Sequence, residues 1–364
     1  MEKRWKTLAL ALALSMLAVI FVSCAQEAPE VTGGEAAGTA GLAGAPEDEY
    51  YLITYATGME YWYPVYAGFK EAGNHLGVKT FYAGSAEQDA AAEVQVFDET
   101  LAKNPKGIFL SPITAEAFKE PIDRAVAQGV AVVTFASDSP NSARQGYISS
   151  DNESAGQTAA RAIGDELGGA GKVMVMRNPG QTNHDIRCNT FIKTIEAEYP
   201  GVEIVADEIS NQDPDAAYTA VMTVAQRHPD LSAVFSPEVN SGIGSARAAK
   251  ELGGAIKCIC VGVNAEVLDM IKADEFWMAL NPDQGVQGYM GMLMTFMIAE
   301  PDLFNPMNSK KAEGTNPTYI PFVDNGLNRI TKENADSYYV DQYATSLGYE
   351  DIADMLSPGD PSAA

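Results

Sequence analysis

The sequence is poor in the residues and motifs on which several classes of protein depend. It has four cysteines and three histidines among 364 residues; the cysteines are too sparse for a disulfide-stapled domain, and no two pairs of them have the spacing of a zinc ribbon. A phosphate-binding loop ending in Gly-Lys-Ser/Thr and a Gly-x-Ser-x-Gly nucleophile elbow are both missing. We therefore expect no metal site, no cofactor and no catalytic residues, and a protein that is not an enzyme.

Basic side chains are also scarce. Lys and Arg number 24 against 49 Asp and Glu, and the formal net charge is −25. Such a surface repels nucleic acid and anionic lipid headgroups, so neither is an expected partner. The apolar fraction of 46% is ordinary for a globular protein. About 315 residues follow residue 49, which is room for two lobes or one large domain.

Residues 1–24 have the layout of a secretory leader. A basic head precedes an apolar run of 15 residues, Leu8 to Val22, which is shorter than the ~20 that a membrane-spanning helix needs. The tetrapeptide from Phe21 to Cys24 resembles the bacterial lipobox, with Phe21 where Leu is usual. We expect cleavage of the leader and a lipid anchor on Cys24; the alternative is a plain secretory leader cut near Ala25. Either leader places the domain outside the cytoplasmic membrane, in the periplasm or at the membrane's outer face.

Residues 25–49 are mostly Ala, Gly, Pro and Glu, and we expect them to form a flexible tether. From residue 50 onward, short β-rich runs alternate with amphipathic stretches of helical period. Strands are predicted over 51–55, 79–82, 107–110, 130–135, 146–149, 172–176, 203–209, 232–235, 256–263 and 276–280. Helices are predicted over 63–76, 86–103, 115–128, 154–167, 215–227 and 241–252.

Several predicted strands are apolar on both faces, as in a parallel sheet covered by helices. The run 256–263 is an example, and its Cys258 and Cys260 lie two residues apart, so both are expected to point into the core from one face. The alternation predicts a doubly wound α/β architecture. A break in the pattern at 137–145 favours two similar lobes joined at a hinge.

Several segments after the strands have a familiar order. They are Tyr61 and Trp62 followed by Gly68 to Glu71, then GVAVVTFASD at 129–138, YISSDNESAG at 147–156, Arg187 with Phe191, HPDLSAVF at 228–235 and VGVN at 261–264. The chain from about 51 to 330 thereby resembles the type I periplasmic solute-binding proteins of ABC transporters. Within them it resembles the ribose-type sugar-binding family, which includes binders of rhamnose and of the furanosyl quorum signal.

The resemblance implies a periplasmic binding protein type I fold, in which two Rossmann-like lobes are joined by a three-strand hinge. The N-terminal lobe is expected to contain 50–152 plus 282–322. The C-terminal lobe is expected to contain 153–281 plus 323–345, with a tail over 346–364.

In the first lobe, the resemblance implies ligand contacts after the first and fourth strands. Tyr61 and Trp62 stand where the family places aromatics that stack on a sugar; the alternative is that they cover a helix end. After the fourth strand the family has an Asp, where this chain has Ala136 and Ser137. Asp138 is expected to substitute from a shifted position, with a turn-forming role as the alternative.

In the second lobe, the resemblance places five ligand positions, and a sixth lies near the third crossover. Asn183, His184 and Asp185 lie at or beside ligand positions, with helix capping as their alternative, and Arg187 is expected to be a structural anchor. Glu238 falls at a polar ligand position, and Asn264 at an acidic one. Asn281 replaces a usual Gln, with Gln284 as the alternative. We expect a polyol-binding pocket that differs from the ribose pocket.

The expected function is that of a monomeric, lipid-anchored receptor of an ABC importer. It would close two lobes on a small polar ligand, a sugar or sugar derivative, and deliver it to the membrane permease. The alternative is a sensory module that presents the same closed form to a receptor kinase or chemoreceptor.

Overall fold

The computed structural model describes residues 42–304 and 321–359, which form two α/β lobes. The leader, the lipid-anchor candidate Cys24 and most of the predicted tether lie outside the described residues. Among the residues described, no helix has the length and apolar character needed to cross a bilayer.

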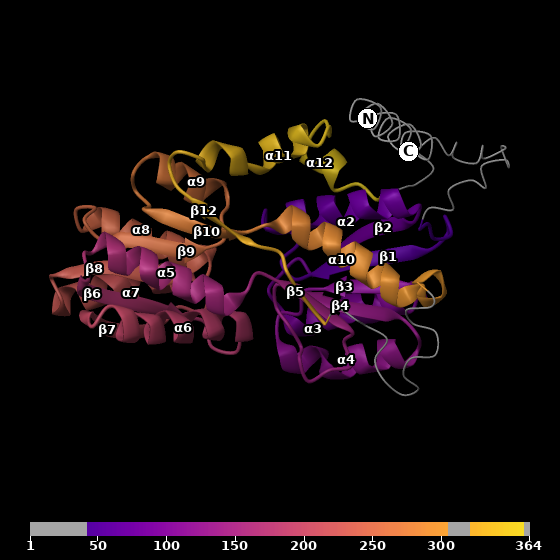
Figure 1. The fold of residues 1–364 in the computed structure, drawn as a ribbon, viewed down its shortest axis with the longest axis horizontal. Coiled ribbons are helices and arrows are strands. Elements are labelled where there is room, and N and C mark those ends of the chain that lie inside the picture. The colour runs from indigo at the N-terminus through magenta and orange to yellow at the C-terminus, as the bar shows by residue number, and fades with distance from the viewer. Residues whose placement is uncertain (1–41, 305–320, 360–364) are drawn as a thin grey trace, which may run out of the picture. The chain divides into compact units, whose positions relative to one another are not determined.

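The first lobe is built on a six-stranded sheet in the order β11-β5-β4-β3-β1-β2 (Figure 1). Its strands, all parallel, are β1 (Glu49–Thr54), β2 (Lys79–Gly84), β3 (Gly107–Leu110), β4 (Ala131–Phe135), β5 (Gly146–Ser149) and β11 (Phe322–Asp324). Its helices are α2 (Trp62–Leu76), α3 (Ala90–Leu101), α4 (Ala115–Ala127) and α10 (Gln284–Ala299).

Helices cover both faces of this sheet because its strands are apolar on both. On β1, Leu52 packs in the core formed with α2 and α10, whereas Ile53, which points to the opposite face, packs in the core formed with α3 and α4. The two-residue period of the strand thus explains the layered arrangement.

The second lobe repeats this architecture with the order β12-β10-β9-β8-β6-β7. Its strands are β6 (Ala170–Arg177), β7 (Gly201–Ile209), β8 (Leu231–Ser236), β9 (Lys257–Val261), β10 (Met278–Pro282) and β12 (Leu327–Ile330), of which β12 alone runs antiparallel to its neighbour. Its helices are α5 (Asn152–Glu166), α6 (Thr182–Glu198), α7 (Pro214–Arg227), α8 (Val239–Glu251) and α9 (Ala265–Lys272).

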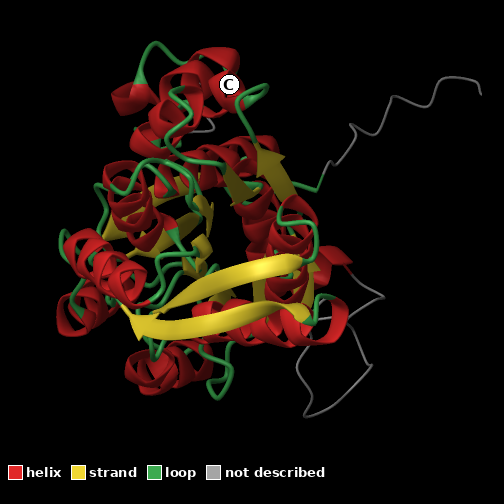
Figure 2. Ribbon diagram, turned by 90° about the vertical axis from the view of Figure 1, so that its left-hand side faces the viewer, coloured by secondary structure: helices red, strands yellow, loops and turns green. Residues whose placement is uncertain are grey.

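Helices again lie on both sides of the strands (Figure 2). The α5 and α6 side contains Phe191 packed on Phe235, and the side of α7, α8 and α9 contains Cys258 and Cys260. Both thiols are buried and free, and they share one face of β9, as the sequence predicted.

The chain passes between the sheets three times: from β5 to α5, from β10 to α10 and from β11 to β12. The two-lobed fold predicted from the sequence is therefore confirmed, and all ten predicted strands are present. The lobe boundary predicted between 322 and 323 falls inside β11, because Asp324 still pairs with Ser149 of the first sheet. Neither β11 nor β12 was predicted.

The C-terminal segment runs from the second lobe to the first (Figure 1). After β12, a 3-10 turn η2 (Ala335–Tyr338) packs on α9. The helices α11 (Val340–Ser346) and α12 (Ile352–Met355) then pack on α2. The segment therefore connects the two lobes in addition to the three crossovers, and α11, most of which was expected in the C-terminal lobe, contacts the N-terminal one.

Candidate functional site

A cavity of about 60 Å³ lies between the lobes. The first lobe lines it with residues that follow β1 and β4, and the second with residues that follow β6, β7 and β8 and with the last residues of β9 and β10. Ligands of open parallel sheets bind at this position, beyond the carboxyl ends of the strands. Five residues predicted from the sequence line it: Tyr61, Trp62, Asn183, His184 and Glu238.

Aromatic rings form the wall of the cavity on the first lobe. Trp62, the first residue of α2, is 2% exposed and makes edge contacts with Tyr55, Tyr61 and Phe135 at centroid distances of 5.3, 4.9 and 5.9 Å. Its Nε1 has no hydrogen-bond partner among the described residues. Since buried indole N–H groups normally have one, Trp62 is a lining residue with a donor that the described protein leaves unpaired.

Arg187 of α6 supplies the positive charge of the site. Its Nε donates to Asn152 Oδ1 at 2.8 Å and its Nη1 to the Pro237 carbonyl at 2.9 Å. Burial lowers the pKa of Arg187, but a guanidinium stays charged in proteins. Arg187 is thus held as a structural anchor, as expected, and it also lines the cavity with Nη2 unused by the described protein.

Asn178, directly after β6, forms hydrogen bonds with two of the predicted residues, His184 and Glu238. Its Nδ2 lies 3.3 Å from His184 Nδ1 and donates to Glu238 Oε1, also at 3.3 Å. Burial first, and then the charge of Arg187, lower the pKa of His184 well below its usual range. The imidazole is therefore neutral near pH 7, with one nitrogen as donor and the other as acceptor.

Glu238 is both a cavity residue and a helix cap. Its carboxylate accepts from the backbone N–H groups of Asn240 and Ser241 at 2.6 and 2.8 Å, at the start of α8. It also accepts from the Ser241 hydroxyl. Burial raises the pKa of Glu238, and these hydrogen bonds oppose the shift. Most of its accepting capacity is used by the protein.

Helix capping does not account for Asn183, His184 and Asp185. The N-cap of α6 is Gln181, and none of the three side chains caps the helix. Asn183 lines the cavity and is 8% exposed, and its Oδ1 is buried without a hydrogen-bond partner among the described residues. Asp185 does not line the cavity, and its Oδ1 lies 4.0 Å from Arg177 Nη1.

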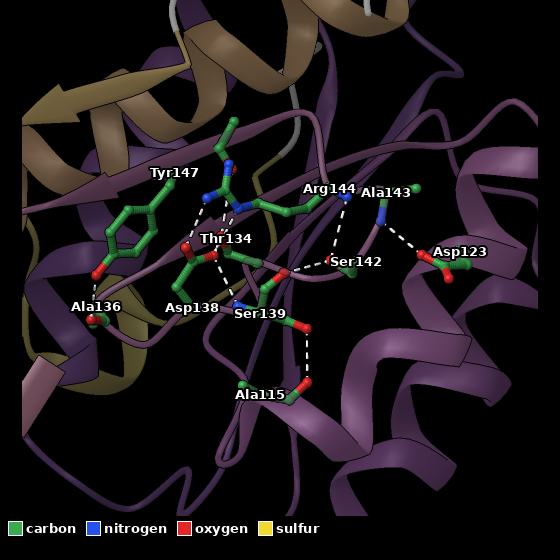
Figure 3. Close-up of polar contacts among 11 residues, drawn as sticks. Ala115, Asp123, Thr134, Ala136, Asp138, Ser139, Ser142, Ala143, Arg144 and Tyr147 are labelled. Atoms are coloured by element: carbon green, nitrogen blue, oxygen red, sulfur yellow. Dashed lines mark hydrogen bonds and ion pairs between the residues drawn. The ribbon is translucent and has the colours of Figure 1, made fainter. Parts of the chain in front are cut away.

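Asp138 also lies outside the cavity lining, in the loop after β4 (Figure 3). Arg144 Nε and Nη2 each donate to it at 2.7 Å, and it accepts from the Thr134 hydroxyl at 2.6 Å and from the Ser139 N–H at 2.8 Å. These contacts occupy the carboxylate within its own loop, and a ligand contact of Asp138 in place of the family's Asp stays a prediction. Asp138 has the turn-forming role that was its alternative.

Asn264 and Asn281 line a different cavity of about 270 Å³. Asn264 caps α9, because its Oδ1 accepts from the Val267 N–H at 2.9 Å. Asn281 and Gln284 exchange two hydrogen bonds of 2.9 and 3.1 Å, so both alternatives for this position belong to one pair.

Three lining residues of the smaller cavity with polar side chains, Tyr55, Ser137 and Gln212, were not predicted as ligand residues. Tyr55 is the last residue of the predicted strand 51–55, whereas β1 ends at Thr54, so a search that included the last residue of each predicted strand would have found it. The neighbouring Ala136 has φ +54, a strained conformation for a residue other than glycine. No sequence signal marks Gln212, whose loop after β7 reaches the site only through the fold. The described part of the chain contains no group of His, Cys, Asp and Glu suited to a metal ion.

Comparison with known proteins gives one family and several relatives. Residues 50–301 match the family described as the periplasmic binding protein domain. The D-allose-binding periplasmic protein of Escherichia coli strain K12 is 25% identical over 255 residues, which are 66% of this chain and 82% of that protein. The ribose import binding protein of Bacillus subtilis strain 168 is 23% identical over 270 residues, 72% of this chain and 84% of that protein.

Two solved structures are similar over most of their length. The arabinose-binding protein of Geobacillus stearothermophilus is 31% identical, with a TM-score of 0.74 over 81% of this chain and 100% of that chain. The sugar-binding protein of a sugar ABC transporter from Bacillus halodurans is 29% identical, with a TM-score of 0.75 over 80% of this chain and 100% of that chain.

Proposed function

Because the chain belongs to the periplasmic binding protein family, we propose that it is an extracytoplasmic sugar-binding protein of an ABC importer. It binds and presents a sugar or sugar derivative and does not transform it. Its relatives are named for allose, ribose and arabinose binding, and this range favours a carbohydrate ligand without choosing one.

The observation that supports a sugar most strongly is that two residues lining the cavity each have an unpartnered polar atom. Trp62 Nε1 is a donor on the first lobe and Asn183 Oδ1 an acceptor on the second, and both are buried. Buried polar atoms are costly when unpaired, so a complementary ligand carries both donors and acceptors on its rim. A sugar has hydroxyl groups of this kind and a C–H face that packs on the rings of Tyr61 and Trp62.

Lobe closure is the functional event in this proposal. A ligand that accepts from Trp62 and donates to Asn183 contacts both lobes, and such contacts favour the closed arrangement over the open one. The permease recognises the closed arrangement. A lipid on Cys24 keeps the monomeric receptor beside the membrane that holds its partner.

Thermal denaturation tests this function with the purified protein and a panel of pentoses, hexoses and polyols. At least one sugar is expected to raise the melting temperature, because a ligand that binds only the native state stabilises it. Trp62→Ala is expected to abolish the shift. Trp277→Ala, which removes an indole outside the cavity, is the matched control and is expected to retain it. A panel without any shift would contradict the proposal.

A further inference from the structure

The larger cavity adjoins the smaller one and is separated from it by a thin partition. The ring of Tyr61 lies 3.9 Å from the position that a Cβ on Gly262 would occupy. Neighbouring residues divide on the two sides of this contact: Tyr61 and Val261 line the smaller cavity, and Glu60 and Val263 the larger. The partition is therefore about one side chain thick.

The partition consists of contacts between the two lobes. Glu60 and Tyr61 directly precede α2 of the first lobe, and Gly262 and Ala265 follow β9 of the second. Besides the Tyr61–Gly262 contact, the Ala265 N–H donates to Glu60 Oε2 at 2.9 Å. Separation of the lobes breaks both contacts and joins the two cavities in one cleft. A ligand bound before closure can therefore lie across the Tyr61–Gly262 contact and leave the Glu60–Ala265 hydrogen bond to form beside it on closure.

The lining of the larger cavity has the chemistry of a carbohydrate site. It contains four carboxamides, two carboxylates and two tyrosines: Asn264, Asn281, Gln284, Asn328, Glu60, Asp283, Tyr338 and Tyr343. The backbone of Asn328 pairs with Asn281 in the sheet, but its side chain has no hydrogen-bond partner among the described residues, and the side chain of Asn264 uses only its Oδ1. Such groups both donate to and accept from hydroxyls, while the rings offer apolar surface.

The outer wall of the larger cavity is held firmly in place. Ser337, Tyr338, Val340 and Tyr343 of the C-terminal segment contribute to it. On the second lobe, an ion pair of Lys272 with Asp336 at 2.5 Å and a hydrogen bond from Tyr339 to Asp269 fix the segment. On the first lobe, α11 and α12 pack on α2.

The volumes of the two cavities also favour a ligand that occupies both. A cavity of about 60 Å³ is far below the roughly 300–1,000 Å³ of typical ligand pockets. Together with the adjoining 270 Å³, the space reaches the lower end of that range. A ligand that fills both cavities contacts Asn264 and Asn281 as well as Tyr61 and Trp62.

We propose that one ligand spans both cavities, which deepens, and rests on, the sugar-binding function proposed above. One sugar ring lies against Tyr61, Trp62 and Arg187, and a second polar unit lies against Asn264, Asn281 and Asn328. The preferred ligand is accordingly a disaccharide or a glycoside with a polar aglycone, and a free monosaccharide fills only part of the site.

Titration calorimetry on the purified protein tests this inference with matched pairs: L-arabinose and arabinobiose, D-xylose and xylobiose, D-galactose and galactobiose, and D-glucose and cellobiose. At least one disaccharide is expected to bind about tenfold or more tightly than its monosaccharide, because each added hydrogen bond contributes about 1 kcal/mol.

Variants assign the gain to the larger cavity. Asn328→Leu and the milder Tyr338→Phe are expected to reduce the preference for the disaccharide, Asn328→Leu about tenfold, while monosaccharide affinity changes less than twofold. Gln342→Leu, on an exposed carboxamide of α11 outside the lining, is expected to change neither.

Two outcomes contradict different proposals. Monosaccharides that bind as tightly as every matched disaccharide, or a preference untouched by both cavity variants, would overturn the spanning ligand and leave sugar binding intact. Absence of binding by every carbohydrate would overturn the sugar-binding function as well.

Discussion

Glu93 of α3 is a carboxyl group buried completely inside the first lobe. Its Oε2 accepts from the Ile113 N–H at 2.9 Å, which holds the loop after β3, and its Oε1 has no partner among the described residues. Burial raises the pKa of Glu93 to about 8. Burial first, and then the charge of Glu93, raise the pKa of Tyr55, a residue that lines the smaller cavity.

This raised pKa predicts a pH dependence of stability. Between pH 4.5, the ordinary pKa of the group, and about 8, the native state keeps a proton that the unfolded state has released. The contribution of Glu93 to the free energy of unfolding therefore falls with rising pH, by about 1 kcal/mol per pH unit in this window. Glu93→Gln keeps the acceptor for Ile113 and removes the titration, so its stability relative to the native protein is expected to rise from pH 5 to pH 8.

Urea unfolding at pH 5, 6, 7 and 8 measures the effect of Glu93→Gln. Glu99→Gln, an exposed site on the same helix, is the control and is expected to show no such trend. A constant difference between Glu93→Gln and the native protein across this range would contradict the prediction.

At the scale of elements, the C-terminal segment is attached to the first lobe by a buried methionine and a buried lysine. Met355 of α12 is fully buried against α2, in a cluster with Ala67 and Ala344. Lys70 Nζ donates to the carbonyls of Asp354 and Ser357 at 3.0 and 3.1 Å. A cation at the C-terminal end of α12 satisfies carbonyls that the helix leaves free.

Met355→Asp is expected to release α12 from α2, since an unpaired carboxylate cannot be buried among apolar side chains without a cost of several kcal/mol. Release also breaks the bridge in which Thr80 and Gly359 exchange backbone hydrogen bonds of 3.3 and 2.9 Å. Hydrogen exchange at these two amides is expected to accelerate. Ala353→Asp, at an exposed position of α12, is the control, and equal protection in both variants would argue against this attachment.

At the scale of the whole molecule, closure depends on a few contacts between the lobes. The hydrogen bond from the Ala265 N–H to Glu60 is one of them, and it places a carboxylate at the N-terminus of α9. A charge at this position is also favoured by the helix dipole. The contact exists only while the lobes are together, so it stabilises the closed arrangement alone.

Glu60→Ala is therefore expected to weaken sugar binding about fivefold, equivalent to about 1 kcal/mol. The change is expected mainly in the dissociation rate, because the lost contact forms after the ligand is bound. Stopped-flow fluorescence with a sugar identified in the thermal panel measures both rates. Glu196→Ala, on the exposed face of α6, is the control, and an unchanged dissociation rate in Glu60→Ala would show that this contact does not hold the lobes closed.

Local patterns in the sequence were sufficient to predict the two-lobed α/β architecture and some of the residues that line the smaller cavity. Strands apolar on both faces can be buried only between helices, and the two-residue period placed Cys258 and Cys260 on one side of β9. Tyr61, Trp62, Asn183, His184 and Glu238 were predictable because parallel strands bring their carboxyl ends to one edge.

Only the tertiary structure decided which polar side chains are free to meet a ligand. Arg144 donates two hydrogen bonds to the Asp138 carboxylate, and the local sequence around Asp138 is equally compatible with a carboxylate that is free. Asn264 and Asn281 are separated from the other candidates by the contact of Tyr61 with Gly262, residues about 200 positions apart in the chain. Contacts of this kind depend on how two lobes meet, which no local period or motif encodes, because they are set by the packing of distant surfaces.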